Sequence, residues 1–210
     1  MAVSASSHPA DPGRGVSSRD RILASAKQLF AARGYENTST VAIARLAGTS
    51  ESQLMKHFGS KEGLLECIFD NGWENLASSL GALQQVPSPV QKLRVLLDAT
   101  IAGLEHDPEL KQLMLLEGRR IRREGRMVLM TNGFLAYVSI IDGILAEMRA
   151  AGQLRPDLST QVVRSALIGM FEGILRDQLL GDKAEFPSNA GVADLRQFFD
   201  IVLPALAPAR

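Results

Sequence analysis

Hydrophobic residues recur at helical spacing along almost the whole chain, three or four positions apart. No segment alternates polar and apolar residues in the way a half-buried strand does. The spacing and the helix-breaking Gly and Pro residues predict nine helices, at residues 18–33, 40–47, 51–58, 61 to the Pro87-Ser88-Pro89 break, 89–105, 108–122, 124–151, 158–181 and 191–206. The predicted fold class is therefore all-α.

The ends of the first three helices carry clear signals. Ser18 is a candidate N-cap of the first helix, and Gly34 suits the position just after its end. The second helix follows the capping residues Thr38-Ser39-Thr40, and the third follows Ser50. The second and third are separated only by a short turn that begins at Gly48, which allows a tight reversal. This arrangement is typical of a helix-turn-helix, although non-DNA-binding helical proteins contain it too.

Composition agrees with a folded protein that has a polar N-terminal arm. The 210 residues are 46% hydrophobic and 22% charged, well away from the composition of disordered chains. Residues 1–17 are rich in Ser, Pro, Gly and Ala, which predicts a disordered arm. Net charge is zero overall, but residues 1–61 carry eight basic and four acidic side chains, and the remainder is correspondingly acidic. A basic end suits contact with phosphates, and chance fluctuation explains such counts equally well.

Few residues offer catalytic or metal chemistry. The single cysteine, Cys67, lies in an apolar run and predicts a buried thiol. The three histidines, His8, His57 and His106, are far apart in the sequence, and no phosphate-binding or zinc-protease motif occurs. We expect no enzymatic activity, no metal and no cofactor. The sequence has no apolar run long enough for a membrane span and no signal peptide, so we expect a cytoplasmic protein that does not contact membranes.

The string RILASAKQLFAARGYENTSTVAIARLAGTSESQLMKHFGSKEGLLECIF resembles the N-terminal domain of the tetracycline-repressor (TetR) family. The resemblance covers roughly 48 residues, and the C-terminal two-thirds match only in helix number and length. Three positions depart from the family pattern: Ser52 stands where a glycine is usual, Met55 where a tyrosine contacts a phosphate, and Thr49 where a valine is common. The resemblance implies a two-domain protein, with a three-helix DNA-binding domain at residues 18–61 and an effector-binding and dimerisation bundle at residues 62–210.

The predicted DNA-binding residues lie at helix N-termini and on the outward side of the third helix. Helix N-termini attract phosphates, and Gln, Lys and carboxylate side chains can hydrogen-bond base edges. The set is Ser39, Thr40, Ser50, Glu51, Ser52, Gln53, Lys56, His57 and Lys61. Of these, Lys61 is placed against the DNA backbone by the resemblance. Two alternatives stay open: Glu51 can instead compensate the helix dipole, and His57 can pack beside Phe58.

The resemblance also implies a dimer interface and an internal effector pocket in the C-terminal bundle. Candidate dimer residues are Ala166, Gly169, Gly173, Leu195, Phe198, Phe199 and Val202. Candidate pocket residues are Trp73, Leu113, Leu116, Glu117, Met130, Phe134, Tyr137 and Met170. Each can equally belong to an ordinary core. Glu117 would need a partner if buried, and Arg119, Arg120 or a cationic ligand could supply it.

These expectations combine into one functional hypothesis. The chain is predicted to be a homodimeric repressor that binds a pseudo-palindromic double-stranded DNA operator and leaves it when a small, mostly apolar effector binds. A DNA-binding protein without an effector, constitutive or controlled by a partner, is the main alternative. A helical interaction module with a vestigial DNA-binding domain is a second, prompted by Ser52 and Met55.

Overall fold

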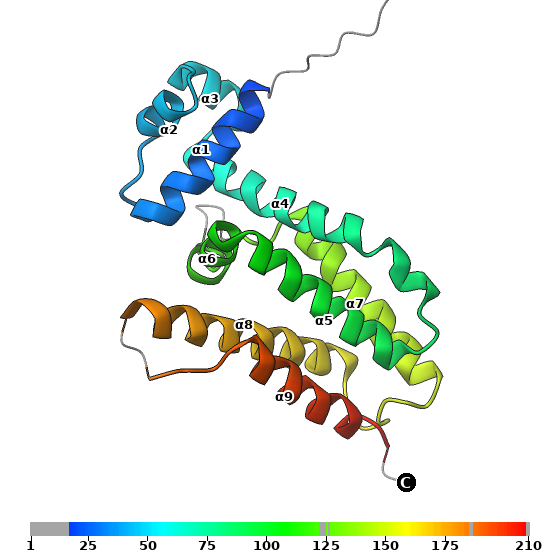
Figure 1. Cartoon of the computed structure of the whole chain (residues 1–210). Helices are drawn as coiled ribbons and strands as arrows, with labels where there is room; N and C mark the ends of the chain where they lie inside the picture. The colour runs from blue at the N-terminus through cyan, green and yellow to red at the C-terminus, as the bar shows by residue number, and fades with distance from the viewer. Residues whose placement is uncertain (1–16, 122–124, 126, 185–186, 209–210) are drawn as a thin grey trace, which may run out of the picture.

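The computed structural model describes residues 17–121, 125, 127–184 and 187–208, and within them it confirms the all-α prediction (Figure 1). These residues form nine α-helices and one 3₁₀ helix, η1, with no strand. The helices are α1 Ser18–Arg33, α2 Thr40–Leu46, α3 Glu51–Phe58, α4 Lys61–Ser79, η1 Gly81–Gln85, α5 Pro89–His106, α6 Pro108–Glu117, α7 Asn132–Ala150, α8 Thr160–Ala184 and α9 Val192–Ala205. Apart from Ser17, the predicted arm at residues 1–17 lies outside the described residues.

Serine hydroxyls cap the N-termini of the first four helices. Ser39, Ser50 and Ser60 each accept a hydrogen bond from the backbone N–H three residues later. The cap of α1 is Ser17 rather than the predicted Ser18, because the Ser17 hydroxyl accepts from the Asp20 N–H at 3.1 Å. Each cap satisfies an N–H that the helix itself leaves unpaired, so four successive helix starts are fixed locally by sequence.

Helices α1, α2 and α3 pack around a small apolar centre. Ile22, Ile43 and Leu54, one from each helix, are fully buried. Gly48 adopts a positive φ of 63° in the turn between α2 and α3, which only glycine adopts without strain. The Arg21 guanidinium donates to the carbonyl of Ala47 at 3.1 Å and so ties α1 to the end of α2. The helix-turn-helix geometry thus follows from three buried side chains, one glycine and one cap.

The long fourth helix predicted from Lys61 to the Pro87 break is in fact two elements. α4 ends at Ser79, and η1 continues the chain with 3₁₀ geometry. Leu80 and Leu83 remain buried, at 7% and 6% exposure, so the apolar pattern persists although the α-helix does not. The hydrophobic period identified the buried positions correctly but could not distinguish the two helix types.

The predictions of helices at 108–122 and 124–151 were wrong at their facing ends. α6 stops at Glu117, and α7 begins only at Asn132, capped by the Thr131 hydroxyl. Between them, Ile121 and Met127 form an isolated antiparallel bridge. Val128 and Leu129, which precede α7, lie in the core, where they are 1% and 8% exposed. Their burial outweighs the helix-favouring arginines of this segment.

Two hydrophobic clusters meet along α4. The first joins α1, α2 and α3 to α4, α6 and the Val128-Leu129 segment, and the second joins α5, α7, α8 and α9. Figure 1 shows α8 and α9 forming a layer beneath α5 and α7, with α1–α3 beside the N-terminal end of α4. No helix among the described residues combines the length and apolar character needed to cross a bilayer. Helix α4 therefore connects the helix-turn-helix to the large bundle.

Candidate DNA-binding face and internal cavity

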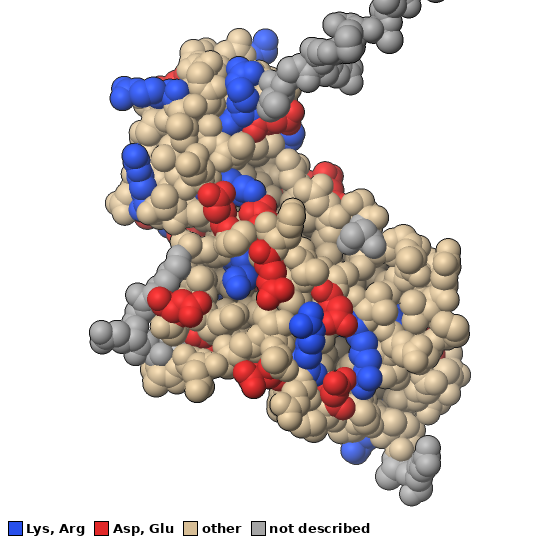
Figure 2. All heavy atoms as spheres, viewed as in Figure 1, with Lys and Arg blue, Asp and Glu red and all other residues tan. Residues whose placement is uncertain are grey.

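One side of α3 is buried and the other is open to solvent. Leu54 and Phe58 pack into the core, at 0% and 8% exposure. The exposed side chains of α3 are Glu51, Ser52, Gln53, Met55, Lys56 and His57. Figure 2 shows more basic than acidic side chains on the part formed by α1–α3 in this view. Five of the predicted DNA-binding residues thus lie on the exposed side of α3, and their contact with DNA stays a prediction.

The start of α2 is tied to the start of α3. The Thr40 hydroxyl donates to the carboxylate of Glu51, and both side chains belong to the first turn of their helices. The hydroxyls of Ser39 and Ser50 accept from their own helices, so each retains its hydrogen for donation to an anion. Glu51 therefore has an intramolecular partner besides the helix dipole, whereas the two serine hydroxyls are exposed at the helix ends and accept only from their own helices in these contacts.

At the other end of α3, His57 lies near α1. Its Nε2 atom is 3.3 Å from the hydroxyl of Ser18, and its ring lies 6.0 Å from that of Phe58. Arg45, an exposed cation in the last turn of α2, was not among the predicted residues. Its position next to Leu46, the last residue of α2, did not indicate in the sequence that Arg45 would be an exposed cation on this part of the protein.

Lys61 opens α4 and lies against Tyr35 rather than pointing freely outward. Its ammonium is 4.2 Å from the ring centroid of Tyr35 and donates to the Glu36 carbonyl at 3.4 Å. Partial burial lowers the pKa of Lys61, and the carboxylate of Glu36 opposes that shift. The predicted phosphate-binding cation is therefore held by two intramolecular contacts.

Arg120, which follows α6, reaches the same tyrosine. Its guanidinium lies 4.4 Å from the Tyr35 ring centroid, donates to Glu117 at 2.6 Å and also donates to the Glu36 carboxylate. Burial, with a smaller contribution from Glu62, raises the pKa of Tyr35 to about 12, against the opposing charge of Arg120. We call Tyr35, Glu36, Lys61, Glu117 and Arg120 the Tyr35 cluster. It joins the helix-turn-helix, the start of α4 and the end of α6.

Two polar contacts also connect α1 with α6. Lys27 pairs with Asp107 at 2.5 Å, and both side chains are more than two-thirds buried. The amide of Gln112 donates to the carbonyl of Ala31 at 2.8 Å. Helix α6 is therefore bound to α1 by these two contacts as well as to the helix-turn-helix through the Tyr35 cluster.

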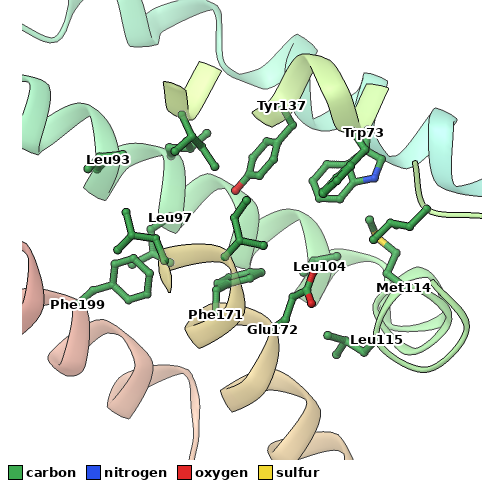
Figure 3. Close-up of a pocket in the computed structure, with 16 residues that line it drawn as sticks. Trp73, Leu93, Leu97, Leu104, Met114, Leu115, Tyr137, Phe171, Glu172 and Phe199 are labelled. Atoms are coloured by element: carbon green, nitrogen blue, oxygen red, sulfur yellow. The ribbon is translucent and has the colours of Figure 1, made fainter. Parts of the chain in front are cut away.

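An apolar cavity of about 60 Å³ lies inside the bundle, between α4 and α7 on one side and α8 on the other. Figure 3 shows Trp73 and Tyr137 entering from one side, with Phe171 and Glu172 opposite. The lining residues are Trp73, Leu93, Leu96, Leu97, Leu104, Met114, Leu115, Leu129, Phe134, Tyr137, Ile141, Leu167, Ile168, Phe171, Glu172 and Phe199. With one carboxylate among fifteen uncharged residues, the lining suits an apolar ligand.

The polar groups of this lining are mostly engaged. Thr100 donates to the Leu96 carbonyl at 2.7 Å, so Tyr137 must be the donor in its 3.1 Å contact with the Thr100 hydroxyl. Burial raises the pKa of Tyr137 to about 12, which keeps it protonated. Glu172 pairs with Arg119 at 3.1 Å and with Arg176 at 3.6 Å.

A second cavity, of about 440 Å³, lies between α4, α5 and α6. It shares Trp73, Leu104 and Met114 with the first, so the two spaces adjoin at these three side chains. Its lining is more polar and includes Asn75 and His106. Together the cavities provide an apolar inner space and a wider, more polar neighbouring one.

The predicted pocket residues divide into two groups. Trp73, Phe134 and Tyr137 line the apolar cavity. The other five lie elsewhere: Leu113 is buried in the first cluster, Leu116 is 45% exposed, Glu117 belongs to the Tyr35 cluster, and Met130 and Met170 are partly buried outside both linings. Sequence reasoning missed the α5 face, whose spacing at Leu93, Leu96, Leu97 and Leu104 indicated only a buried helix.

The candidate dimer residues also divide. Ala166, Gly169 and Phe198 are exposed, and Gly173 and Val202 are partly exposed. Leu195 and Phe199 are buried in the protomer, at 0% and 6% exposure, and Phe199 lines the cavity. Val162 and Ile201, which were not predicted, add 64% and 62% exposed apolar side chains to α8 and α9.

Comparison with known proteins identifies matches over most of the chain. The family model described as bacterial regulatory proteins, tetR family, matches residues 22–68, and that of the YsiA-like protein C-terminal region matches residues 75–187. A relative, the HTH-type transcriptional repressor KstR2 of Mycolicibacterium smegmatis, is 30% identical over 159 residues, which is 74% of this chain and 76% of the relative.

Solved structures share the fold at lower identity. The transcriptional regulator FadR of Bacillus subtilis, in complex with stearoyl-CoA, gives a TM-score of 0.74 at 22% identity, covering 89% of this chain and 96% of that one. AibR, in complex with isovaleryl coenzyme A and operator DNA, gives 0.66 at 23% identity, covering 92% and 100%. At these coverages, both matches extend over α1–α3 and the C-terminal bundle alike.

Proposed function

The chain belongs to the TetR family of bacterial transcriptional regulators, and we propose that it is a homodimeric repressor whose operator binding is released by an acyl thioester. The observation that carries this proposal is the exposed face of α3. The opposite side of α3 is buried through Leu54 and Phe58, and α4 connects the helix to an apolar cavity. Binding of operator DNA would place its action in the cytoplasm.

The DNA-binding unit we propose is residues 18–61. Gln53 and Lys56 are exposed on α3, where they would meet base edges in the major groove. The free hydroxyl donors of Ser39 and Ser50, at two helix N-termini, would meet phosphates. Met55 cannot donate a hydrogen bond, so the backbone contact that a tyrosine makes in relatives is replaced or lost here.

The cavity and two structural neighbours support this ligand class. An almost wholly apolar lining favours an alkyl chain, and the two structural neighbours named above were solved with stearoyl-CoA and isovaleryl coenzyme A. The inner cavity, of about 60 Å³, is much smaller than the roughly 300–1,000 Å³ of typical ligand sites. An acyl chain would therefore have to displace lining side chains, which gives the ligand a preference for a second, wider state.

Ligand binding in the cavity would be coupled to release of DNA through α4 and α6. Trp73 on α4 and Met114 on α6 line the cavity, while Lys61 on α4 and Arg120 after α6 hold Tyr35 in the DNA-binding unit. Widening the cavity would shift α6 relative to α4 and so move α3 with respect to the DNA groove. In a dimer, the spacing between the two α3 helices would then no longer match the spacing between the two operator half-sites.

Dimerisation is supported by an unpaired apolar stripe on α8 and α9. Val162, Ala166 and Gly169 follow one side of α8, and Phe198 and Ile201 follow α9. A side chain added at Gly169 would meet no atom within 4 Å, so this side of α8 is open in the protomer. A second copy would bury the stripe in a two-fold interface and set the spacing between the two α3 helices.

The direct test is binding of the protein to DNA from upstream of its own gene, measured by fluorescence anisotropy. We expect specific affinity of about 10⁻⁸–10⁻¹¹ M at physiological salt, a steep salt dependence, and at least tenfold weakening by a saturating acyl-CoA. Binding that no acyl-CoA of any chain length weakens would favour the effector-independent alternative. Absence of specific binding to any genomic fragment would favour the vestigial DNA-binding domain.

A further inference from the structure

The indole N–H of Trp73 is a buried hydrogen-bond donor without a partner. Trp73 is 7% exposed, and its Nε1 atom has no hydrogen-bond partner among the described residues. The other two such side-chain atoms, on Gln153 and Gln178, belong to residues that line neither cavity. Proteins rarely leave a buried donor unpaired, because desolvating it is unfavourable. An orphaned donor in a cavity wall indicates a ligand acceptor.

The indole is held firmly in its orientation. Its ring lies 5.3 Å from that of Phe134 and 4.7 Å from that of Tyr137, both on α7. A Cβ atom at Gly133 would approach the Cβ of Trp73 to 2.7 Å, so the glycine allows α7 to press against this part of α4. Figure 3 shows the nitrogen edge of the indole turned towards Met114 and away from Tyr137. The nitrogen edge therefore lies on the side of Met114, one of the residues that line both cavities.

The remaining polar groups of the inner cavity cannot serve the same ligand atom. Tyr137 already donates its hydroxyl hydrogen to Thr100. Glu172 is a carboxylate and can only accept. The cavity thus offers one uncommitted donor beside an apolar wall, while its single carboxylate is already paired with Arg119 and Arg176. This combination suits an uncharged oxygen acceptor on an apolar chain.

We propose that the Trp73 indole N–H donates a hydrogen bond to the acyl carbonyl oxygen of the effector, between Trp73 and Met114. The alkyl chain then fills the inner cavity, and the rest of the molecule leaves through the wider cavity between α4, α5 and α6. This assignment rests on the proposed function and specifies which atom of the thioester is recognised. It makes Trp73 the residue that distinguishes an acyl thioester from an alkyl chain without a carbonyl.

The test pairs two ligands with two forms of the residue. Dodecanoyl-CoA and S-dodecyl-CoA, a thioether in which a methylene replaces the carbonyl, are titrated calorimetrically into wild type and Trp73→Phe. Wild type should bind the thioester roughly fivefold more tightly, the factor a neutral hydrogen bond typically contributes. Trp73→Phe should bind both ligands with the same affinity. Replacing Trp73 by benzothienylalanine, which keeps the indole shape without the N–H, gives the same comparison if the phenylalanine variant does not fold.

The outcomes separate the two proposals. If wild type binds both ligands equally, or Trp73→Phe keeps the preference, the Trp73 assignment is wrong while the acyl-CoA effector stands. If Tyr137→Phe loses the preference for the thioester and Trp73→Phe keeps it, the carbonyl oxygen accepts its hydrogen bond from Tyr137, and the Trp73 assignment is overturned. If wild type binds neither ligand, the acyl thioester hypothesis fails and the assignment fails with it. Because Trp73 is the single tryptophan of the chain, its fluorescence reports directly whether each ligand reaches it.

Discussion

The guanidinium of Arg120 lies over the ring of Tyr35, 4.4 Å from its centroid, and joins two segments that are 85 positions apart in the chain. Tyr35 is buried beside the helix-turn-helix, and Arg120 follows α6, which contributes to the lining of the apolar cavity. Lys61 lies over the same ring from α4. A change in the position of α6 or α4 would therefore reach Tyr35 through these two direct contacts.

Arg120→Ala should uncouple ligand binding from DNA release. The substitution removes a cation–π contact and two ion pairs, so the ratio of operator affinities without and with dodecanoyl-CoA should fall by roughly fivefold. Fluorescence anisotropy with a labelled operator measures that ratio. The matched control is Arg155→Ala, which removes an arginine of the exposed Arg155–Asp157 pair between α7 and α8. An unchanged ratio in Arg120→Ala would exclude the Tyr35 cluster from the coupling path.

Gln53→Ala and Lys61→Ala should weaken DNA binding in different ways. Gln53 is exposed on α3, so its loss should relax base preference at one operator position by about 1–3 kcal/mol. Lys61→Ala should weaken binding to every sequence and reduce the salt slope by about one. Competition with operators changed at single positions and titrations in rising salt measure the two effects. A destabilised Lys61→Ala protein with an unchanged salt slope would show that Lys61 serves Tyr35 rather than phosphate.

The two tyrosines should resist ionisation in the folded protein. Burial raises the pKa of both Tyr35 and Tyr137 to about 12, against about 10 in an unfolded chain. Because the folded pKa values are the higher ones, their contribution to stability is complete below pH 10 and is lost as pH rises towards 12. Near-ultraviolet absorbance should show almost no tyrosinate at pH 10.5, and a jump when urea is added. Appearance of one tyrosinate near pH 10 without unfolding would show that one ring is solvated.

Local patterns in the sequence predicted the helices and the exposed face of α3 well. Ser39, Ser50 and Gly48 act within a few residues of their own positions, so their roles follow from composition and spacing. The segment after α6 could not be predicted in this way. Its path depends on burial of Val128 and Leu129 and on the contacts of Arg120 with residues far away in the chain.

The cavity shows the same limit. Trp73, Phe134 and Tyr137 were expected to line a pocket because the family resemblance implied one in the C-terminal bundle, and they lie in one lining. Glu117 was expected there too, but it lies outside both cavities and pairs with Arg120, one of the partners that the sequence offered. Helical period identifies the buried side of each helix, whereas the place where several buried sides fail to fill space depends on how the helices cross.

Gly63→Ala should destabilise the connection between α3 and α4. A Cβ atom at this position would lie 2.3 Å from the carbonyl oxygen of Phe58, a backbone atom that cannot rotate away. We expect a loss of about 1–3 kcal/mol in the free energy of unfolding, measured in urea at fixed protein concentration. Gly143→Ala is the control, because a Cβ there meets nothing within 4 Å inside α7. It should gain about 0.5–1 kcal/mol, and equal stability of both variants would mean that the connection relaxes freely.

Ile201→Glu should convert the proposed dimer to a monomer. Ile201 is 62% exposed on α9, in line with Phe198, and a carboxylate there would be buried without a partner in a two-fold interface. Light scattering during size-exclusion chromatography should give half the wild-type mass, and operator affinity should fall because a single α3 contacts only one half-site. Leu135→Glu is the control, since Leu135 is 45% exposed on α7, away from the stripe, and should leave the mass unchanged. If Ile201→Glu keeps the wild-type mass while Leu135→Glu lowers it, the two copies associate through α7 rather than through α8 and α9.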